Sequence, residues 1–474
     1  MSQPHEYDLI VIGAGNAGQE CASVARAAGW RVAIIESRDV GGTCPLRGCV
    51  PKKVLAAASE AADLVRRADK LSLRLGPQAL RLEPQALRLG PPAPDSNLPV
   101  LDWTALIARE RTFVDGVAAA MKEDLARRGI EVIEGRARFV DRHAVAVSGR
   151  AEPVRARKFL VATGSVPRRL AFPGADRLLT SDDLLELGAL PPSVAFVGAG
   201  VIAFELGHVM ARAGARVTML ESAPRVLAGH DAGAVDWLVQ ASAARGIDVR
   251  SGVEVQSIEA APDGTHVIRF VEGTPRELRV HAVAHGAGRT ADLEGLDLAA
   301  AGIETDGMQP HLDEAHCSPS NPDVWFAGDA VPGKPQLSAL ATYEGRLVAR
   351  NLIRDEHAAP DYRSVPSVVF TTPALASVGA TEEEARARGL TFETRVNDMR
   401  TWRSARTYAE EFAWAKVLVD RTADRVVGAH LVGHGAADFI NTFALAMRYG
   451  ISVTSLAEGV YAYPTVHSEL KFLF

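Results

Sequence analysis

The stretch YDLIVIGAGNAG, residues 7–18, decides the fold of this 474-residue chain. Its first half is an apolar strand, and a helical pattern runs from the glycines to Gly29. A second strand, residues 31–35, ends in Glu36. This order is the fingerprint of a dinucleotide-binding domain, in which a pyrophosphate faces the helix start and the acid accepts hydrogen bonds from a ribose. The glycines of the fingerprint are Gly13, Gly15 and Gly18.

The same pattern occurs a second time. A strand at residues 194–197 leads into Gly198, Gly200 and a helical pattern, and the strand that follows ends in Glu221. From the first glycine to the acid is 23 positions in both copies. Because two accidents at one spacing are improbable, we predict two nucleotide-binding domains of one plan.

Two of the four cysteines lie five residues apart in GGTCPLRGCVPKK, residues 41–53. An ideal helix would separate the Cα atoms of Cys44 and Cys49 by about 8–9 Å, whereas a disulfide tolerates at most about 7 Å. The turn must therefore be distorted if the pair is to close, and Gly48 and Pro51 permit or force distortion. We interpret the pair as a redox disulfide.

The position of the cysteine pair assigns the cofactors. The pair follows Glu36 by eight residues, which places the redox chemistry in the first domain. A dithiol exchanges two electrons and a nicotinamide delivers them as hydride, so a flavin is the natural relay. We therefore predict FAD at the first site and a nicotinamide dinucleotide at the second. Glu221 favours NADH because a carboxylate suits a free 2′-hydroxyl and repels a 2′-phosphate, whereas the nearby Arg225 keeps NADPH as an alternative.

Together these motifs resemble the flavin-dependent pyridine nucleotide–disulfide oxidoreductases, the family of glutathione reductase, dihydrolipoamide dehydrogenase and mercuric reductase. The redox run matches the family form G-G-T-C-x-N-x-G-C-x-P except at Leu46, where Asn is usual. The resemblance implies that Cys44 is the thiol that attacks the substrate and Cys49 the thiol that contacts the flavin. It covers almost the whole chain, and it is far more specific for the family than for the substrate.

The resemblance also implies further cofactor contacts. Residues 135–139, 159–164 and 324–329 are similar to flavin-binding strands of the family, and residues 283–289 to the strand that leaves its nicotinamide domain. Val201 stands where a Tyr often covers the flavin, and Ala203 resembles the glutathione reductases that use NADPH. The implied FAD contacts, with those of the first fingerprint, are Gly13, Gly15, Gly18, Glu36, Gly42, Thr43, Lys53, Ala137, Thr163, Gly164, Asp329, Leu337 and Ser338. The implied NAD(P) contacts are Gly198, Gly200, Val201, Glu221 and Gly288.

A lysine follows the second redox cysteine. Lys52 lies three residues after Cys49 on the same helical face, where a cation would stabilise a thiolate. The resemblance pairs this lysine with an acid on the second nucleotide-binding helix, a position that Glu205 occupies.

The active-site base is the largest departure from the family, which usually has His-Pro-Thr with a Glu five residues after the His. This chain has Tyr463 in the His position, and Glu469 follows six residues later. A free Tyr has a pKa of about 10 and is a poor base at neutral pH. His467 is the alternative if the turn bulges by one residue. We predict that Tyr463 is the proton donor to the leaving thiolate.

We predict an α/β fold with two Rossmann-like dinucleotide-binding domains and a C-terminal α+β dimerisation domain. A long helix is expected over residues 103–128, and residues 71–97 hold a short repeat with a Pro in each copy, which we interpret as a loop insertion. The predicted divisions are 1–165 for the first segment of the FAD-binding domain, 166–291 for the NAD(P)-binding domain, 292–359 for the FAD/central segment and 360–474 for the dimerisation domain.

The composition argues against several other classes of protein. With 47% hydrophobic and 23% charged residues it is typical of globular proteins. A formal net charge of −6 without a basic stripe argues against a nucleic-acid partner. The sequence has no apolar run of about 18 residues, so we predict no membrane span, and it leaves no room for a signal peptide before the first strand. We therefore predict a cytoplasmic protein. In that reducing compartment a disulfide is more often catalytic than structural. Cys21, in a helical pattern, and Cys317, in a loop, are interpreted as structural thiols, and no metal site is predicted.

We predict an FAD-dependent NAD(P)H:disulfide oxidoreductase that acts on a small disulfide, similar to dihydrolipoamide dehydrogenase or glutathione reductase, and works as a homodimer. A flavin-level reductase of quinones or metal ions is the first alternative, and a redox-sensing flavoprotein of low turnover is the second. Mercuric reductase itself is disfavoured, because residues 471–474 lack the family's vicinal cysteines and no N-terminal metal-binding module is found. These motifs do not identify the substrate.

Overall fold

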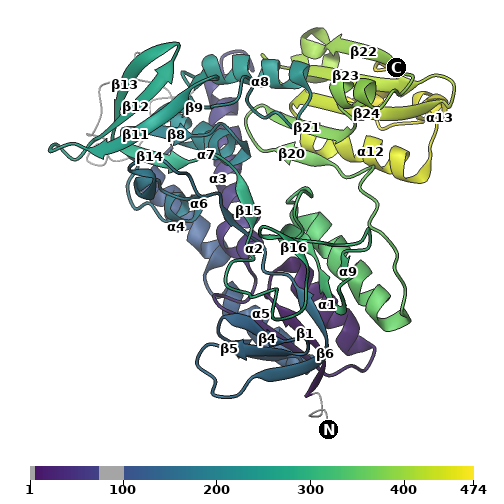
Figure 1. Ribbon diagram of the computed structural model, residues 1–474. Helices are drawn as coiled ribbons and strands as arrows, with labels where there is room; N and C mark the ends of the chain where they lie inside the picture. Colours follow the sequence, from purple (N-terminus) through teal and green to yellow (C-terminus); the bar gives the residue numbers. More distant parts are fainter. Residues whose placement is uncertain (1–5, 74–100) are drawn as a thin grey trace. The chain divides into compact units, whose positions relative to one another are not determined.

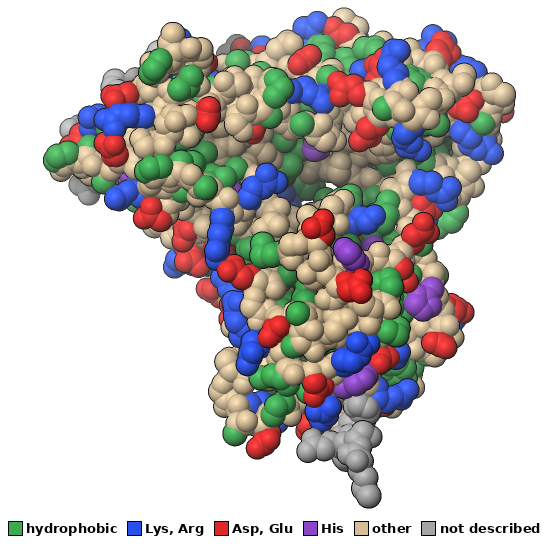
Figure 2. All heavy atoms as spheres, viewed as in Figure 1, with side chains coloured by type: hydrophobic (Ala, Val, Ile, Leu, Met, Phe, Trp, Pro, Cys, Tyr) green, Lys and Arg blue, Asp and Glu red, His purple; other side chains and the backbone are tan. Residues whose placement is uncertain are grey.

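The computed structural model describes residues 6–73 and 101–474 (Figure 1). The repeat at residues 74–97 lies outside the described residues. Within the described ranges, no helix combines the length and apolar character needed to cross a bilayer. Acidic and basic side chains are interspersed over much of the face drawn in Figure 2. Contacts divide the chain into a first unit of residues 1–51, 110–168 and 289–361, and a second unit of residues 52–109, 169–288 and 362–474.

The first unit is built on a mainly parallel sheet in the order β3-β2-β1-β6-β19-β18. β1, β2, β3, β6 and β19 run parallel, and β18 pairs with β19 antiparallel. A hairpin of β4 and β5 joins the sheet through β6. The strand bounds are β1 Tyr7–Ile12, β2 Val32–Glu36, β3 Glu131–Glu134, β4 Ala137–Asp141, β5 Ala144–Val147, β6 Val154–Val161, β18 Cys317–Ser318 and β19 Asn321–Phe326.

Both faces of this sheet are covered. Along β1, Ile10 and Ile12 point into one hydrophobic cluster, whereas Leu9 and Val11 point into another that includes α1 (Asn16–Ala27). This is the period of two that a strand buried on both faces requires, and it explains the unbroken apolar run in the sequence.

A second helix, α9 (Ser338–Arg354), lies beside α1 (Figure 1). The close packing needs a glycine, because a Cβ added to Gly345 would lie 2.2 Å from the carbonyl oxygen of Ala17. The two helices therefore approach backbone to backbone, and residues at their N-terminal ends come within hydrogen-bonding distance.

The second unit repeats the first plan. Its parallel sheet has the order β10-β9-β8-β14, which corresponds to β3-β2-β1-β6. The helix after the second glycine loop, α7 (Val201–Arg212), begins and ends 185 positions after α1. The predicted duplication is confirmed. The strand bounds are β8 Ser193–Val197, β9 Arg216–Leu220, β10 Asp248–Arg250 and β14 Ala282–His285. Between β10 and β14 in the sequence, a separate antiparallel sheet is formed by β11 Glu254–Ala260, β12 His266–Glu272 and β13 Thr274–Val280.

The C-terminal part of the second unit is an antiparallel sheet in the order β20-β21-β24-β23-β22. Helix α8 (Ala232–Ala243) and helix α12 (Ala436–Tyr449) both pack against it. This is the predicted α+β domain, and the fold class is thereby confirmed. The strand bounds are β20 Ser367–Val369, β21 Ala374–Gly379, β22 Glu393–Asp398, β23 Trp414–Asp420 and β24 Arg425–Gly433.

Two local expectations were wrong. The helix expected over residues 103–128 is divided into α4 (Trp103–Val114) and α5 (Val117–Arg127), because Gly116 adopts φ = +79° and stops the helical path. Cys317 lies in the short strand β18 and not in a loop. The four-part division of the chain stays a prediction.

The remaining elements connect these layers. They are the helices α2 Thr43–Arg47, α3 Cys49–Arg66, α6 Ser181–Leu185, α10 Glu382–Ala387, α11 Arg403–Thr407 and α13 Val453–Glu458, the 3₁₀ turns Ala175–Arg177, Gly328–Ala330, Met399–Thr401 and Val466–Phe472, and the strand pairs β7 Ser165–Pro167 with β15 Arg289–Ala291 and β16 Thr305–Asp306 with β17 Gln309–Pro310.

Candidate active site

The first glycine loop exposes bare backbone at the start of α1. A Cβ added to Gly13 would lie 2.3 Å from the carbonyl oxygen of Ala162, and one added to Gly18 would lie 2.0 Å from that of Gly13. At Gly15 the added atom would meet nothing within 4 Å. Two of the glycines are therefore needed for packing, while Gly15 leaves room above the free N–H groups of the helix, as a pyrophosphate requires.

Glu36 lies directly against this loop. Its Oε2 accepts a hydrogen bond of 2.7 Å from the backbone N–H of Ala14, and its Oε1 accepts one of 2.8 Å from Arg38. The backbone N–H of Gly135 donates to the carbonyl oxygen of Glu36, which brings the segment before Ala137 to the end of β2. Residues predicted to hold the adenosine part of FAD thus lie together.

The second glycine loop reproduces this geometry. Oε2 of Glu221 accepts a hydrogen bond of 2.8 Å from the N–H of Ala199, and Oε1 accepts one of 2.9 Å from Ala223. A Cβ added to Gly198 would lie 2.4 Å from Ala287. Gly288, at φ = +87°, has no heavy atom within 4 Å of the position of an added Cβ, so the backbone is open at the end of β14.

The cation nearest in sequence to Glu221 is already engaged. Both terminal nitrogens of Arg225 donate to backbone carbonyls of its own loop, those of His230 and Ala228, and one also pairs with Glu383 at 3.0 Å. Arg225 is therefore held in a structural role, and the carboxylate of Glu221 directly follows β9.

The segments predicted to bind the flavin meet at the carboxyl ends of parallel strands. After β6, the buried hydroxyl oxygen of Thr163 has no hydrogen-bond partner among the described residues. After β19, Asp329 accepts a hydrogen bond of 3.0 Å from the hydroxyl of Ser165, and burial raises the pKa of the Asp329 carboxyl. A buried hydroxyl oxygen without a partner among the described residues and a partly buried carboxyl at one sheet edge suit a polar ligand such as a flavin ribityl chain.

The redox run is docked on the first glycine loop. The N–H of Gly41 donates to the carbonyl oxygen of Ala14 at 3.0 Å, and a Cβ added to Gly42 would lie 2.8 Å from Cα of Gly15. Gly42 adopts φ = +68°, which strongly favours glycine. These contacts hold the segment that contains Cys44 and Cys49 against the glycine loop of the first fingerprint.

The expected distortion between the cysteines occurs at Gly48. Helix α2 ends before Gly48 and α3 begins with Cys49, so the two cysteines belong to different helices. Neither cysteine is in a disulfide; Cys44 is partly buried, Cys49 is exposed, and Cys49 hydrogen-bonds to Cys44. The two sulfur atoms are therefore adjacent.

A hydrogen-bond chain leads from α1 to Cys44. The Nδ2 of Asn16 donates to the hydroxyl oxygen of Ser338 at 2.5 Å, and the Ser338 hydroxyl donates to Sγ of Cys44 at 3.0 Å. Hydrogen bonds from Cys49, and then from Ser338 and Asn16, outweigh the effect of burial and lower the pKa of Cys44 to about 6. Because the thiolate is the nucleophilic form of Cys, this chain of hydrogen bonds favours the reactive form of Cys44.

Sequence reasoning missed the role of Asn16. Ser338 was predicted as a flavin contact and not as a partner of Cys44. The sequence did offer a signal for Asn16: the dinucleotide fingerprint requires no hydrogen-bonding side chain between its glycines, yet Asn16 stands there.

Replacing Ser338 with Ala should raise the apparent pKa of the thiol pair from about 6 toward the ordinary value for cysteine, about 8.5. Below that value less thiolate would be present, so alkylation of Cys44 by iodoacetamide should slow several-fold at pH 6–7 and recover as the pH rises. Peptide mapping of the reduced protein over a pH series measures this. Thr342→Ala removes a hydroxyl one turn later on α9 and should leave the apparent pKa of alkylation unchanged. An equal apparent pKa in the unaltered protein, Ser338→Ala and Thr342→Ala would contradict the role of Ser338.

The structure brings Lys52 and Glu205 together. Nζ of Lys52 lies 2.7 Å from Oε1 of Glu205, which also accepts a hydrogen bond of 2.8 Å from the N–H of Phe370. The Lys52 ammonium lies 4.1 Å from the centre of the Phe370 ring, and that of Lys53 lies 4.7 Å from it. Phe370 was not predicted as a site residue, yet its backbone N–H binds Glu205 and its ring contacts Lys52. Lys53, predicted to contact FAD, pairs with Glu60.

The C-terminal candidates point in different directions. Tyr463 is 68% exposed, with the guanidinium of Arg403 5.5 Å from the centre of its ring. His467 hydrogen-bonds to Thr442 and packs on Phe439, and burial lowers its pKa.

Glu469 is buried and accepts hydrogen bonds from the backbone and hydroxyl of Ser404. His467 and Glu469 line a cavity of about 340 Å³, but no hydrogen bond joins them among the described contacts. The His–Glu pairing that is usual in the family is thus absent from these contacts.

With this geometry in place, comparison with known proteins defines the class. The chain belongs to the pyridine nucleotide-disulphide oxidoreductase family: the family model matches residues 7–345, and its dimerisation domain matches residues 365–473. The family is FAD-dependent and uses NAD(P)H, and the chain is accordingly a flavoprotein oxidoreductase that acts on sulfur groups. The resemblance read from the sequence is confirmed.

Individual relatives with different activities match almost the whole chain. It is 31% identical over 471 residues to glutathione reductase of Burkholderia cepacia, covering 99% of each chain. It is 29% identical over 473 residues to mercuric reductase of Staphylococcus aureus, covering 98% of this chain and 81% of the relative. The Cu(II) complex of RclA, the HOCl-induced flavoprotein disulfide reductase of Escherichia coli, superposes with a TM-score of 0.84 at 25% identity and 99% coverage of both chains. These matches do not single out one substrate.

Proposed function

We propose that the protein reduces a small disulfide with electrons from NAD(P)H, in the manner of dihydrolipoamide dehydrogenase or glutathione reductase. One observation carries this proposal: the Cys44–Cys49 thiol pair is docked on the first glycine loop, and Cys44 is hydrogen-bonded by Ser338 at 3.0 Å. An NADH-dependent screen of disulfides, quinones and metal ions on the purified protein tests it, with disulfides expected to sustain turnover that depends on Cys44.

The residues of the first unit fit FAD. Gly15 would admit the pyrophosphate, Glu36 the ribose, and Thr163 and Asp329 the ribityl chain. When bound, FAD would relay the two electrons of a nicotinamide hydride to the cysteine pair.

The thiols then perform the exchange. The Cys44 thiolate attacks one sulfur of the substrate disulfide and forms a mixed disulfide, while the second substrate sulfur leaves and takes a proton. Cys49 then attacks Sγ of Cys44, closes the Cys44–Cys49 disulfide and expels, as the second product thiol, the substrate sulfur that Cys44 had attacked. The substrate gains two electrons from the cysteine pair and two protons, of which the Cys49 thiol supplies one and a separate proton donor the other. We propose that Tyr463 of the second copy in a homodimer donates the proton, which the match of residues 365–473 to a dimerisation domain supports.

The helix that begins with Cys49 carries Lys52 one turn later, and Lys52 forms an ion pair with Glu205. The pair is largely buried, so Glu205 holds the ammonium in place and Phe370 covers it. A cation one turn after Cys49 in sequence favours the thiolate. We also propose that the protein acts in the cytoplasm, since redox cysteines of this kind are maintained as catalytic pairs in a reducing compartment.

Replacing Glu221 with Ala should narrow the preference for NADH over NADPH. We propose this preference because Glu221 places a carboxylate at the end of β9, and because Arg225 is engaged by Glu383 and by carbonyl oxygens of its own loop. Like charges about 4 Å apart cost roughly 1 kcal/mol in water and more near a protein surface, so the ratio of kcat/KM values should shift at least about 5-fold. Ser222→Ala, beside Glu221 and uncharged, should leave the ratio unchanged. An unaltered ratio in Glu221→Ala would count against Glu221 as the selector.

Reduction of a metal ion is the second candidate function. The observation that favours it is Tyr463 in place of the usual His, because the disulfide step then lacks a ready base. A relative is named mercuric reductase and a similar structure is a Cu(II) complex, which supports the same candidate. In the screen above, turnover with metal ions and none with disulfides would favour this function.

A further inference from the structure

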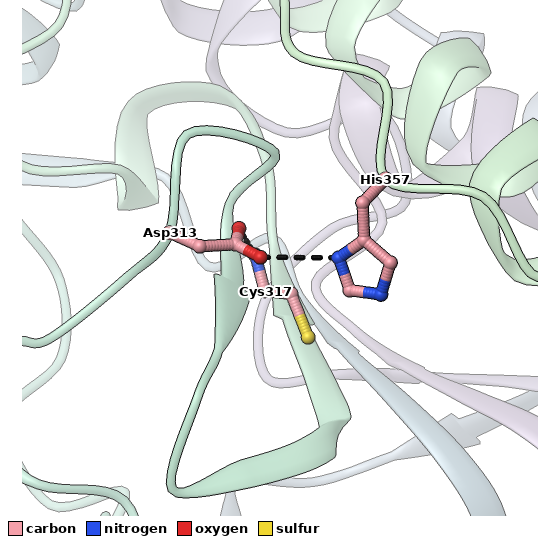
Figure 3. Close-up of side chains that lie close together, drawn as sticks. All are labelled: Asp313, Cys317 and His357. Carbon is pink, nitrogen blue, oxygen red and sulfur yellow. Dashed lines mark hydrogen bonds and ion pairs between the residues drawn. The ribbon is translucent and has the colours of Figure 1, made fainter.

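Three side chains with different donor atoms converge on the first unit. Asp313 lies before β18, Cys317 begins β18, and His357 follows α9 (Figure 3). One carboxylate oxygen, the thiol sulfur and one imidazole nitrogen all lie within 4.8 Å of one another. None of the three residues takes part in the site described above.

The fold fixes the carboxylate of this Asp–Cys–His cluster. Oδ1 of Asp313 accepts hydrogen bonds from the backbone N–H groups of Ala315 and Cys317, at 2.9 and 2.8 Å. Oδ2 is thereby turned toward His357, whose Nδ1 lies 3.1 Å away. Cys317 is held by pairing of β18 with β19 opposite Trp325.

The imidazole is held by packing. The ring of His357 lies against that of Trp325, with 5.0 Å between the ring centres. Its side chain is still 52% exposed, and that of Asp313 is 34% exposed, whereas Cys317 is buried beneath them. An ion could therefore enter from solvent between the two outer groups, and water could complete its coordination.

The donor set selects the ion. Sulfur, imidazole nitrogen and carboxylate oxygen are the ligands of Zn²⁺ at about 2.0–2.3 Å, and three protein ligands plus water is a common zinc arrangement. Tetrahedral ligands at those lengths are about 3.3–3.8 Å apart. The carboxylate and imidazole are already that close, so the remaining adjustment is about 1 Å at the sulfur. Ca²⁺ and Mg²⁺ prefer oxygen alone and do not match this set.

We propose that Asp313, Cys317 and His357 form a binding site for Zn²⁺ that ties the loop after α9 to β18. Binding replaces the thiol proton by a Zn–S bond and releases that proton to solvent. Burial raises the pKa of the Cys317 thiol to about 12, so the ion must displace a firmly held proton. The sequence predicted no metal site, because the three residues lie 4 and 40 positions apart and match no ligand spacing.

The experiment uses the untagged, FAD-loaded chain with Cys44 and Cys49 both changed to Ser, so that the redox thiols cannot bind the metal. Zn²⁺ added in calorimetry, and retained after dialysis, should reach one ion per chain. His357→Ala in this background should weaken binding at least about 100-fold, since it removes a direct ligand. His143→Ala is the matched control, because His143 also faces an aspartate, Asp323 at 3.7 Å, in the same unit.

Co²⁺ tests the sulfur ligand directly. The protein with Co²⁺ should show a near-ultraviolet thiolate-to-cobalt band, which Cys317→Ser abolishes and Cys21→Ser, a change at another buried cysteine, preserves. Absence of Zn²⁺ binding, or binding equally tight in His357→Ala, would overturn the proposal. A band that persists in Cys317→Ser would also overturn it. If Cys317→Ser does not fold, the exposed His357→Ala variant still decides.

Discussion

Replacing Cys44 with Ser should abolish reduction of disulfides by NADH. A serine hydroxyl is not ionised near neutral pH and cannot form the mixed disulfide, so kcat/KM should fall on the order of 10⁴-fold or more, as when other catalytic nucleophiles are removed. Bleaching of the flavin by NADH in the absence of a disulfide should continue, because Cys44 is not required for hydride delivery. Stopped-flow absorbance and steady-state turnover measure the two steps separately.

Cys21→Ser provides the control for this change. Cys21 is fully buried in α1, and burial raises its pKa strongly, so it cannot serve as a nucleophile. Its replacement should alter turnover little. If Cys44→Ser kept disulfide turnover within tenfold of the unaltered protein, attack by Cys44 would be excluded.

Replacing Tyr463 with His should accelerate the disulfide half-reaction. A positioned acid typically contributes about 10²–10⁴-fold to such a proton transfer, and an imidazole can cycle near neutral pH whereas a phenol cannot. Tyr463 is 68% exposed, so the new ring has room. Single-turnover oxidation of the prereduced protein by a disulfide measures the gain, and flavin reduction by NADH should be unchanged.

His467→Ala discriminates the two candidate proton donors. His467 is turned toward Thr442 and Phe439 of its own unit, so its loss should change the half-reaction little. Should His467→Ala instead eliminate disulfide turnover while sparing flavin reduction, the bulged alignment would be right and Tyr463 would not be the donor.

The parts of this fold that could be predicted are those with local, repeated signals. Each glycine fingerprint combines an apolar strand, a tight turn and an acid within about 30 residues, and the two copies support each other. The distortion at Gly48 was also predictable, because helix geometry alone prevents a disulfide between cysteines five apart. The Lys52–Glu205 pair needed the family resemblance, since 153 positions separate its members.

The parts that were missed depend on contacts between distant segments. Asn16 meets Ser338 because α1 and α9 pack closely at Gly345, and the sequence around either residue does not encode that crossing. Phe370 and the Asp–Cys–His cluster were hidden for the same reason. Gly116 ended a helix whose apolar pattern continued on both sides, because a positive φ overrides the pattern.

The proposed exchange of two electrons between NAD(P)H and the Cys44–Cys49 pair is tested most directly by a count of thiols. The air-oxidised protein is denatured before and after anaerobic addition of one equivalent of NADH, and free thiols are titrated with a chromogenic disulfide. The chain has four cysteines, so we expect two thiols before NADH, from Cys21 and Cys317, and four afterwards. A count that NADH leaves unchanged would contradict the account.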